Sequence, residues 1–282
     1  MPISLTEVIN DLPEMTVVDI GSAFHSDKLQ TDYQALVDLD KVKIVGFDPD
    51  TSYADEFERR HNGKHKIHPY AIGDGTTGRF HHNRYSLTSS LYPTHHEVAD
   101  KYQNLGAELM VTKRVEDIET HRLGDLSHLA GLEDVDAIYL DIQGGELDAL
   151  RHAGAILEDA ALIHTEVEFI EIYQGQPLFA DVDIMLRDNG YMFHTLKYIG
   201  SRCLKPIVLK GDVNTGLNQY VWADAVYVKN IQNFDRMSDE KLLKLAFITN
   251  DVYGSVDLCY HVLHELDHRH GTSIRNDYLG AL

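Results

Sequence analysis

Short apolar runs rich in β-branched residues alternate with segments of helical period from about residue 16 to residue 230. This alternation constrains the fold most, because it is typical of βαβ units around a mostly parallel sheet. Seven runs predict strands, at residues 16–21, 43–48, 65–72, 136–141, 161–168, 191–197 and 219–228. We therefore expect an α/β fold built on a seven-stranded, mostly parallel sheet.

Length and composition allow one folded domain with additions. The 282 residues correspond to about two domains at roughly 150 residues each, or to one α/β domain with appendages. Apolar residues make up 43% of the chain and charged residues 25%, which excludes collagen-like, low-complexity and wholly disordered classes. We expect a main domain over residues 1–230 and a helical C-terminal extension over residues 231–282.

Two segments depart from the alternation of strands and helices. Between about residues 75 and 120 the sequence is rich in Gly, His, Tyr and Ser, with histidine pairs at His81/His82 and His95/His96. This composition predicts an inserted hairpin and loop, which we interpret as a lid or a substrate wall. The C-terminal extension carries an apolar stripe of helical spacing, formed by Val252, Val256, Cys259, Val262, Leu263 and Leu266. The stripe is expected to pack on the main domain or on a second subunit, so a homo-oligomer is one hypothesis.

The charge balance limits the partners. There are 45 acidic residues against 25 basic ones, and the formal charge of −20 repels phosphate backbones and anionic lipid surfaces. We therefore expect neither nucleic acid nor a membrane as a partner.

Residues 1–15 lack the pattern of an export signal, and Cys203 and Cys259 fit a reducing compartment. These features predict a cytoplasmic protein that acts on a small molecule.

Polar residues follow the predicted strands at the point where each strand ends. The runs that end at Gly21, Asp48, Asp141 and Glu168 close on acidic residues or glycine. Because ligands of open α/β sheets bind beyond the carboxyl ends of the strands, these residues are expected to share one edge. That edge is the predicted ligand site.

The first three strand ends predict a nucleoside site. Asp19 and Gly21 lie at the first turn, where a glycine lets a ligand approach the backbone closely. Asp48 is placed to accept hydrogen bonds from both ribose hydroxyls, although Asp-Pro-Asp is also a common turn composition. Ile72 is available to cover an adenine, and Asp74 to accept a hydrogen bond from its amine. A nicotinamide dinucleotide calls for G-x-G-x-x-G, and the single glycine of this turn favours S-adenosylmethionine instead.

Several segments together resemble a known family. They are VVDIGS, FDPD, HPYAIGD, the SSL at residues 89–91, LDIQGGELDALRHA and EVEFIEIYQGQPLFADVDIMLRDNGY. From about residue 16 to residue 229 the chain is similar to the FkbM-type S-adenosylmethionine-dependent methyltransferases. The resemblance implies a class I methyltransferase (Rossmann-like) fold, with the last strand antiparallel, and O-methylation of a sugar, lipid or natural-product hydroxyl.

The first loop departs from the pattern of that family. The family continues D-x-G-A-N-x-G, whereas Ser22, Ala23 and His25 fill the alanine, asparagine and second glycine positions. Ser22 therefore stands among the predicted cofactor contacts in place of the usual alanine.

The fourth strand end supplies candidates for the reactive end of the cofactor. Methyl transfer from a sulfonium requires orientation of the partners and removal of a proton from the acceptor. Asp141 and Gln143 are placed to face the charged methionine end of the cofactor. Glu146 opens the next helix, and complementing the helix dipole is the alternative role for it.

The fifth strand supplies candidates for the acceptor. His164, Glu166 and Glu168 alternate along it, so they point to the same side. Asp141, Glu166 and Glu168 are the predicted catalytic residues, and the same three carboxylates are a candidate oxygen-ligand site for Mg²⁺ or another divalent ion. The alternatives are hydrogen bonds from loops to the two glutamates and a satisfied core histidine at His164. His25, His194 and the paired histidines of the insertion are further, unranked candidates for a base.

A second motif competes with this interpretation. Residues 264–268 read HELDH, a literal H-E-x-x-H match. Only 14 residues follow His268 and they contain no glutamate, so a third metal ligand is missing and we interpret the motif as a solvated helix end.

Four polar or aromatic residues are candidates for the acceptor pocket. Tyr85, Tyr92, Tyr173 and Gln176 are candidate wall residues of the acceptor pocket. The alternative to an enzyme is a non-catalytic nucleoside-binding or assembly protein on the same fold, which the altered first loop and the apolar tail would suit.

Overall fold

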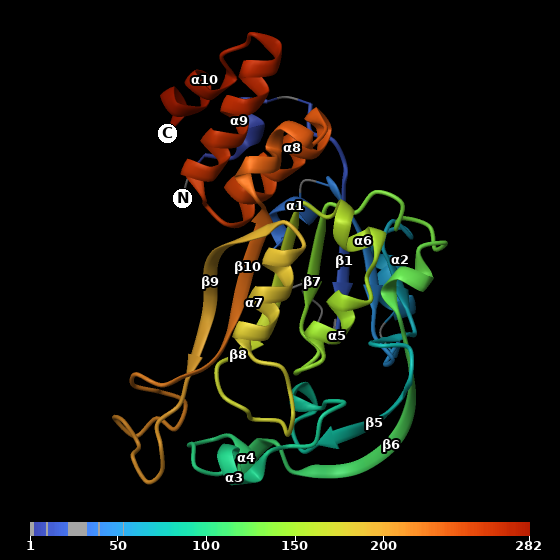
Figure 1. The fold of residues 1–282 in the computed structure, drawn as a ribbon, viewed down its shortest axis with the longest axis vertical. Helices are drawn as coiled ribbons and strands as arrows, with labels where there is room; N and C mark the ends of the chain where they lie inside the picture. The colour runs from blue at the N-terminus through green and yellow to red at the C-terminus, as the bar shows by residue number, and fades with distance from the viewer. Residues whose placement is uncertain (1–2, 10, 22–32, 39, 53) are drawn as a thin grey trace.

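A seven-stranded sheet forms the centre of the molecule (Figure 1). The computed structural model describes residues 3–9, 11–21, 33–38, 40–52 and 54–282. The sheet has the order β3-β2-β1-β7-β8-β10-β9. Its strands are β1 Met15–Ile20, β2 Val42–Phe47, β3 Lys66–His68, β7 Ala137–Leu140, β8 Leu162–Glu168, β9 Tyr191–Ser201 and β10 Tyr220–Lys229. Each of the seven predicted strands therefore contributes to this sheet.

The strand directions confirm a mostly parallel sheet. β1 pairs in parallel with both β2 and β7, and the pairs β2–β3 and β7–β8 are parallel as well. β10, the last strand of the chain, is antiparallel to β8 and to β9. The carboxyl ends of β1, β2, β7 and β8 consequently meet at one edge, as expected.

One predicted strand divides into two. Residues 65–72 form β3 in the main sheet and the short strand β4, Ala71–Ile72, in a second sheet. Pro69 lies between them, and a proline cannot donate a hydrogen bond to a strand ladder.

The inserted segment contains the predicted hairpin. β5 (Thr77–Asn83) pairs antiparallel with β6 (Thr112–His121), and β4 pairs with the other edge of β6. Three short helical segments lie within the connection, which are η2 Ser86–Thr88, α3 His96–Ala99 and α4 Gly106–Leu109. Figure 1 shows this unit beyond the carboxyl ends of the main strands.

Helices cover both faces of the main sheet. The other helices and helical turns are η1 Leu5–Glu7, α1 Gln34–Asp38, α2 Ala54–Arg60, η3 Leu123–Leu126, α5 Glu146–Arg151, α6 Ala155–Asp159, α7 Phe179–Asp188, η4 Ile231–Arg236, α8 Asp239–Phe247, the π-helical turn η5 Ile248–Val252, α9 Val256–His270 and α10 Ile274–Ala281. Val17 belongs to one apolar cluster and its neighbour Val18 to another, as the alternation of a strand requires. The cluster around Val18 includes α5, α6 and α7, and the cluster around Val17 includes α1, α8 and α9.

The C-terminal helices lie at the amino ends of the strands, far from the β5–β6 hairpin (Figure 1). Ser238 caps α8 by accepting a hydrogen bond from the backbone N–H of Lys241 at 3.1 Å. Cys259, Val262 and Leu263 are fully buried in the same cluster as Met15 of β1. The apolar stripe thus packs on its own chain, while an oligomer formed through these helices stays a prediction. Among the described residues, no helix has both the length and the apolar character needed to cross a membrane.

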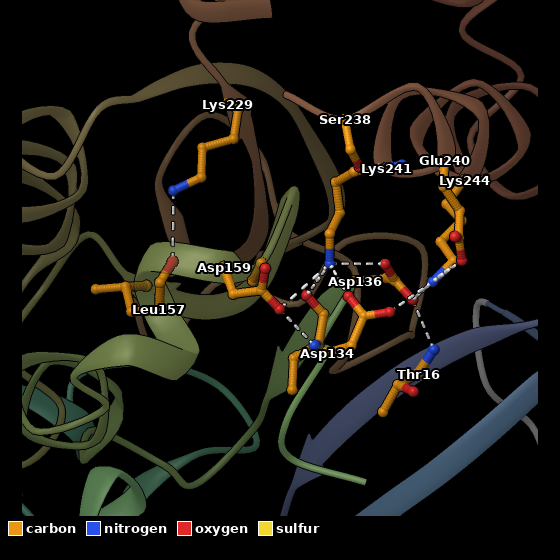
Figure 2. A network of polar contacts seen from close by, with 12 residues as sticks. Thr16, Asp134, Asp136, Leu157, Asp159, Lys229, Ser238, Glu240, Lys241 and Lys244 are labelled. Carbon is orange, nitrogen blue, oxygen red and sulfur yellow. Dashed lines mark hydrogen bonds and ion pairs between the residues drawn. The ribbon is translucent and has the colours of Figure 1, made fainter. Parts of the chain in front are cut away.

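A buried ion cluster fixes α8 to the sheet (Figure 2). The Lys241 ammonium lies 2.9 Å from Asp136, and the Lys244 ammonium lies 3.2 Å from the other oxygen of that carboxylate. Asp134 contacts both lysines, and Asp159 contacts Lys241 at 3.3 Å. Asp136 immediately precedes β7 and accepts a hydrogen bond from the Thr16 N–H at 2.8 Å, so the cluster joins α8, β7 and β1.

The protonation states of this cluster follow from burial and from charge. Burial raises the pKa of Asp136, and the two ammonium groups oppose that rise. Burial lowers the pKa of Lys241, but Asp136 and its acidic neighbours outweigh burial and raise the pKa above the ordinary value. Asp136 is therefore the central anion for two buried cations.

We predict that Asp136→Asn lowers the free energy of unfolding by about 2 kcal/mol. Breaking a buried ion pair costs ~3–5 kcal/mol, and Asp134 and Asp159 retain part of the compensation here. Glu240→Gln is the matched control, because Glu240 pairs with Lys244 at 3.1 Å but is 63% exposed, and its loss is expected to stay below ~1 kcal/mol. Urea unfolding of both variants tests this, and equal losses would contradict a central role for Asp136.

Candidate functional site

The predicted edge of the sheet opens into a cavity of about 550 Å³. Gly21, Asp48 and Asp141 line it from the ends of β1, β2 and β7. Its other described lining residues come from the loops after β2 and β7 and from the inserted unit: Pro49, Asp50, Phe80, His82, Ser86, Leu87, Ser89, Arg114, Glu116, Ile118, Ile142 and Gln143. The inserted hairpin therefore forms a wall opposite the strand ends.

A second cavity of about 210 Å³ adjoins the first. Leu87, Asp141 and Gln143 line both cavities. The remaining described residues of the smaller cavity are Tyr85, Thr88, Leu105, Leu109, Met110, Glu166, Glu168, Ile172, Tyr173, Arg202 and Trp222. The predicted catalytic carboxylates Asp141, Glu166 and Glu168 are thus brought together at one place.

Gln143 connects these carboxylates. Its side-chain amide N–H₂ donates to Asp141 Oδ1 at 2.8 Å and to Glu166 Oε2 at 2.5 Å. Its amide oxygen accepts a hydrogen bond from the Tyr173 hydroxyl at 2.8 Å, and its backbone oxygen accepts one from Ser90 of the inserted unit at 2.6 Å. Gln143 has a φ of 56°, an unusual value for a residue other than glycine that these four bonds maintain.

Glu146 organises the loop that carries Gln143. One carboxylate oxygen accepts from the N–H of Ile142 at 2.8 Å, and the other accepts from the N–H of Gly144 at 2.9 Å. The side chain is buried, and burial raises its pKa to about 7. Glu146 therefore shapes the turn after β7, a more specific role than the helix-dipole alternative.

The remaining carboxyls hold protons more strongly than usual. Burial raises the pKa of Glu166 and of Glu168 well above the ordinary value, and the neighbouring carboxylates raise it further. Burial also raises the pKa of Asp141, and hydrogen bonds from Gln143 and Glu166 oppose that rise.

Two of the three predicted metal ligands have ligand atoms that lie close together. Among the described residues, the group with mutually close ligand atoms, within 4.8 Å, is Asp141, Glu146 and Glu166, and the predicted ligand Glu168 is not part of it. Both oxygens of Glu146 accept backbone hydrogen bonds, and the Gln143 amide lies between Asp141 and Glu166. Glu166 thus accepts a hydrogen bond from the loop after β7, as in the alternative weighed from the sequence, and a divalent ion at these carboxylates stays a prediction.

The protein's own backbone leaves no room for a side chain at Gly21. Its φ is +84°, and a Cβ atom built on it would lie 2.1 Å from the carbonyl oxygen of Asp141. The close contact between the ends of β1 and β7 therefore requires a glycine here. This reason differs from the ligand approach expected from the sequence, although Gly21 also lines the larger cavity.

The other predicted cofactor residues are placed as follows. Asp19 accepts a hydrogen bond from the Tyr33 hydroxyl, and burial raises its pKa to about 6. Asp48 accepts from the N–H of Asp50 at 2.7 Å, so the turn interpretation of Asp-Pro-Asp holds alongside its place in the cavity. Ser22 lies outside the described residues.

Ile72 and Asp74 lie apart from the larger cavity. Ile72 is buried in the apolar cluster around Val18. Asp74 accepts from the backbone N–H of Thr76 at 2.9 Å and from its hydroxyl at 2.6 Å. Neither side chain is among the described residues that line the cavity, and their roles toward an adenine stay predictions.

The chain matches one family over most of the edge just described. The model of the methyltransferase FkbM domain matches residues 19–193, which is well over half of the chain. The chain belongs to the FkbM methyltransferase family. A relative from Sinorhizobium fredii, 2-O-methyltransferase NoeI, is 32% identical over 126 residues. That match covers 44% of this chain and 46% of the relative, so the chain matches about half the length of NoeI.

Solved methyltransferase structures also align with this FkbM-family chain. A magnesium protoporphyrin IX methyltransferase from Synechocystis PCC 6803 with bound SAM aligns with a TM-score of 0.36 and 13% identity, over 80% of this chain and 76% of that one. A SAM dependent methyltransferase from Aquifex aeolicus aligns with a TM-score of 0.31 and 14% identity, over 79% and 86% of the two chains. The strand order and the family match carry the assignment to a Rossmann-like methyltransferase fold.

The histidine candidates of this FkbM-family chain separate in the structure. His164 is buried and hydrogen-bonds to Tyr253 at 2.9 Å and Asp224 at 3.0 Å, as a satisfied core histidine does. His194 bonds to Ser255 at 2.6 Å, and His25 lies outside the described residues. Of the paired histidines, His82 is the one among the cavity residues, where it contacts Glu116 at 2.5 Å.

The HELDH segment is part of α9. His264 and His268 are exposed, and Glu265 pairs with Arg269 at 3.0 Å. These three side chains form no group of close metal-ligating atoms among the residues with described positions. The segment is the solvated helix face expected from the sequence.

Two residues of the smaller cavity were missed from the sequence. The Arg202 guanidinium lies over the Trp222 ring, 4.7 Å from its centroid. Trp222 is the only tryptophan of the chain and lies in a predicted strand, which was the available signal.

Of the predicted wall residues, Tyr85 and Tyr173 line this cavity. Tyr92 instead donates to Asp148 at 2.9 Å, and Gln176 accepts from the Tyr173 N–H at 2.5 Å.

We predict that Gly21→Ala lowers the free energy of unfolding by about 3 kcal/mol. The positive φ contributes ~1–2 kcal/mol and the overlap with the Asp141 carbonyl another ~1–3 kcal/mol. Gly175→Ala is the control, since its φ is +76° but a Cβ there meets nothing within 4 Å, and we expect a loss of about 1 kcal/mol. Chemical unfolding measures both, and a Gly21→Ala loss no larger than the control would show that the strand ends move apart freely.

Proposed function

We propose that the protein is an S-adenosylmethionine-dependent methyltransferase that methylates a hydroxyl of a small molecule, such as a sugar or another natural product. The observation that carries this proposal is the pair of cavities that meet at Asp141 and Gln143. One cavity suits the methyl donor and the other the acceptor, with carboxylates at the junction. Membership of the FkbM family and the name of the relative NoeI support O-methylation.

The larger cavity fits the donor by size and by charge. Its volume lies within the range of about 300–1,000 Å³ typical of ligand sites. Asp48 follows β2, where a carboxylate can accept two hydrogen bonds from a ribose, and Asp141 presents negative charge toward the reactive end. S-adenosylmethionine supplies a methyl group on a positively charged sulfur. We assign Asp48, Gly21, Asp141 and Gln143 to its binding.

The smaller cavity fits an acceptor that must lose a proton. Glu166 faces it next to the junction, and its contact with Gln143 holds the carboxyl toward Asp141. In the ionised form Glu166 accepts the proton of the acceptor hydroxyl, while Gln143 keeps the carboxylate in place. Glu168 and Trp222 lie on the same cavity and contact the body of the acceptor. Orientation at the junction supplies the rest of the catalysis.

We predict that Asp48→Ala weakens S-adenosylmethionine binding by about 100-fold or more. Each hydrogen bond to a charged group contributes ~1.5–3 kcal/mol, and two ribose hydroxyls are lost as partners. Asp55→Ala is the control, because Asp55 is exposed on α2 and lies outside the cavity. Isothermal titration calorimetry measures both affinities. Unchanged affinity in Asp48→Ala would remove the ribose assignment.

We predict that Glu166→Gln lowers the rate of methyl transfer by about 10²–10⁴-fold and leaves S-adenosylmethionine affinity unchanged. The base must be ionised and its pKa is raised, so the rate of the unmodified protein is expected to rise with pH as Glu166 loses its proton. The measurement is methyl transfer to an acceptor found in a panel of sugars, glycosides and other hydroxyl compounds, across a pH series.

Two outcomes of that measurement would contradict the proposal. A large loss in Glu168→Gln with none in Glu166→Gln would move the base to the other glutamate. Tight binding of S-adenosylmethionine without turnover over the whole panel would favour a non-catalytic nucleoside-binding protein on this fold.

A further inference from the structure

The segment from the end of β9 to the start of β10, residues 198–220, exposes many large apolar side chains. We call it the β9–β10 loop. More than half of the exposed large apolar side chains in the described parts of the chain lie in it: Tyr198, Ile199, Leu204, Ile207, Val208, Val213, Leu217 and Tyr220. Protein surfaces rarely gather so much apolar area without a partner. The loop is therefore a candidate interaction surface.

The loop is ordered by its own polar contacts. Arg202 donates to the backbone oxygen of Asn214 at 3.2 Å, and the buried Cys203 thiol donates to that of Thr215 at 3.3 Å. The N–H of Lys205 donates to Lys101 next to α3 at 2.7 Å. These bonds satisfy the inner side of the loop, so the apolar side chains point outward from a fixed frame.

The charge of the loop differs from that of the rest of the chain. It carries three basic residues, Arg202, Lys205 and Lys210, against one acidic residue, Asp212, in a chain whose net charge is −20. Lys205 also pairs with Glu108 at 2.8 Å, whereas Lys210 is exposed near the tip beside Ile207 and Val208. Basic side chains interleaved with exposed apolar ones match an interface that offers anionic headgroups above an apolar layer.

The shape of the loop favours a lipid surface over a second copy of the chain. Figure 1 shows it as an arm that projects from the end of the sheet near α3 and α4. A projecting arm needs no matching recess to enter the interfacial layer of a bilayer.

We propose that the β9–β10 loop docks this protein on a lipid surface that carries anionic headgroups. The expectation of no membrane partner came from the net charge of the whole chain, and the loop is a local exception to that charge. Arg202 and Trp222 stand at the two roots of the loop and line the smaller cavity, so docking would bring the mouth of that cavity close to the surface. The inference does not depend on methyl transfer.

Vesicle co-sedimentation of the full chain tests this proposal. The probes are vesicles of phosphatidylcholine alone and vesicles with about one third phosphatidylserine. We expect binding to the second kind that weakens as salt is raised, because the headgroup attraction is screened. The double variant Ile207→Asp with Val208→Asp is expected to bind at least about tenfold more weakly, since it replaces two exposed apolar tips with repelled charges.

Ile184→Asp is the matched control, because Ile184 is 61% exposed on α7 and lies outside the loop. It is expected to bind vesicles like the unmodified chain. The proposal is overturned if the unmodified chain binds neither kind of vesicle. It is also overturned if the double variant binds as well as the control. A fall in molar mass by light scattering in the double variant, with no vesicle binding by the unmodified chain, would show that a second copy covers the loop instead. Retained S-adenosylmethionine affinity in the double variant keeps the test separate from the proposed function.

Discussion

The Gln143 amide between Asp141 and Glu166 is the contact on which the arrangement of the site depends. A carboxyl from the end of β7 and one from β8 would repel each other once both were ionised. The amide donates one hydrogen atom to each and keeps them at the junction of the two cavities. Its own position is fixed in turn by Tyr173 and by Ser90 of the inserted unit. The insertion is thereby part of the site, and its movement would displace both carboxyls.

Strand β7 links this site to the opposite end of the molecule. Asp136 immediately precedes the strand and Asp141 immediately follows it. Two buried lysines of α8 pair with Asp136. The Asp141 carbonyl lies against the backbone of Gly21 at the end of β1. A strand fixed at both ends gives its last residue a defined place. The C-terminal extension, far from the cavities, thus contributes to the site by holding the start of β7.

The sequence was sufficient for the sheet and for the gathering of the acids, because both follow from local patterns. Strand runs that close on Gly21, Asp48, Asp141 and Glu168 needed only the rule that parallel strands end at one edge. The contacts that set the chemistry of the site could not be predicted from the sequence. Nothing in a one-dimensional pattern indicates that the Gln143 amide lies between two carboxyls or that Glu146 caps its own loop. The divalent ion stays a prediction, because donors from the backbone and from an amide also reach these carboxylates.

Residues distant in sequence were the hardest to place. Arg202 and Trp222 reach the smaller cavity from either side of the connection between β9 and β10, and only the pairing of these two strands brings them together. A second reason for the glycine at Gly21 could not be read from the sequence, because the carbonyl that a side chain there would meet belongs to Asp141, after another strand. A pattern indicates which positions are unusual, while the neighbour that makes them unusual is a property of the fold.

The carboxyls at the junction of the two cavities destabilise the fold as they ionise. Glu146 has its pKa raised to about 7, so its protonated form is favoured by folding. The stability from this group is fully present below its ordinary pKa of 4.5 and is lost as the pH rises through about 7. Glu166 and Glu168 act in the same direction. A positively charged ligand beside Asp141 would favour the ionised form of that carboxyl and would offset part of the repulsion among the acids at neutral pH. Asp141, which lines both cavities, would therefore favour a cationic ligand over a neutral one.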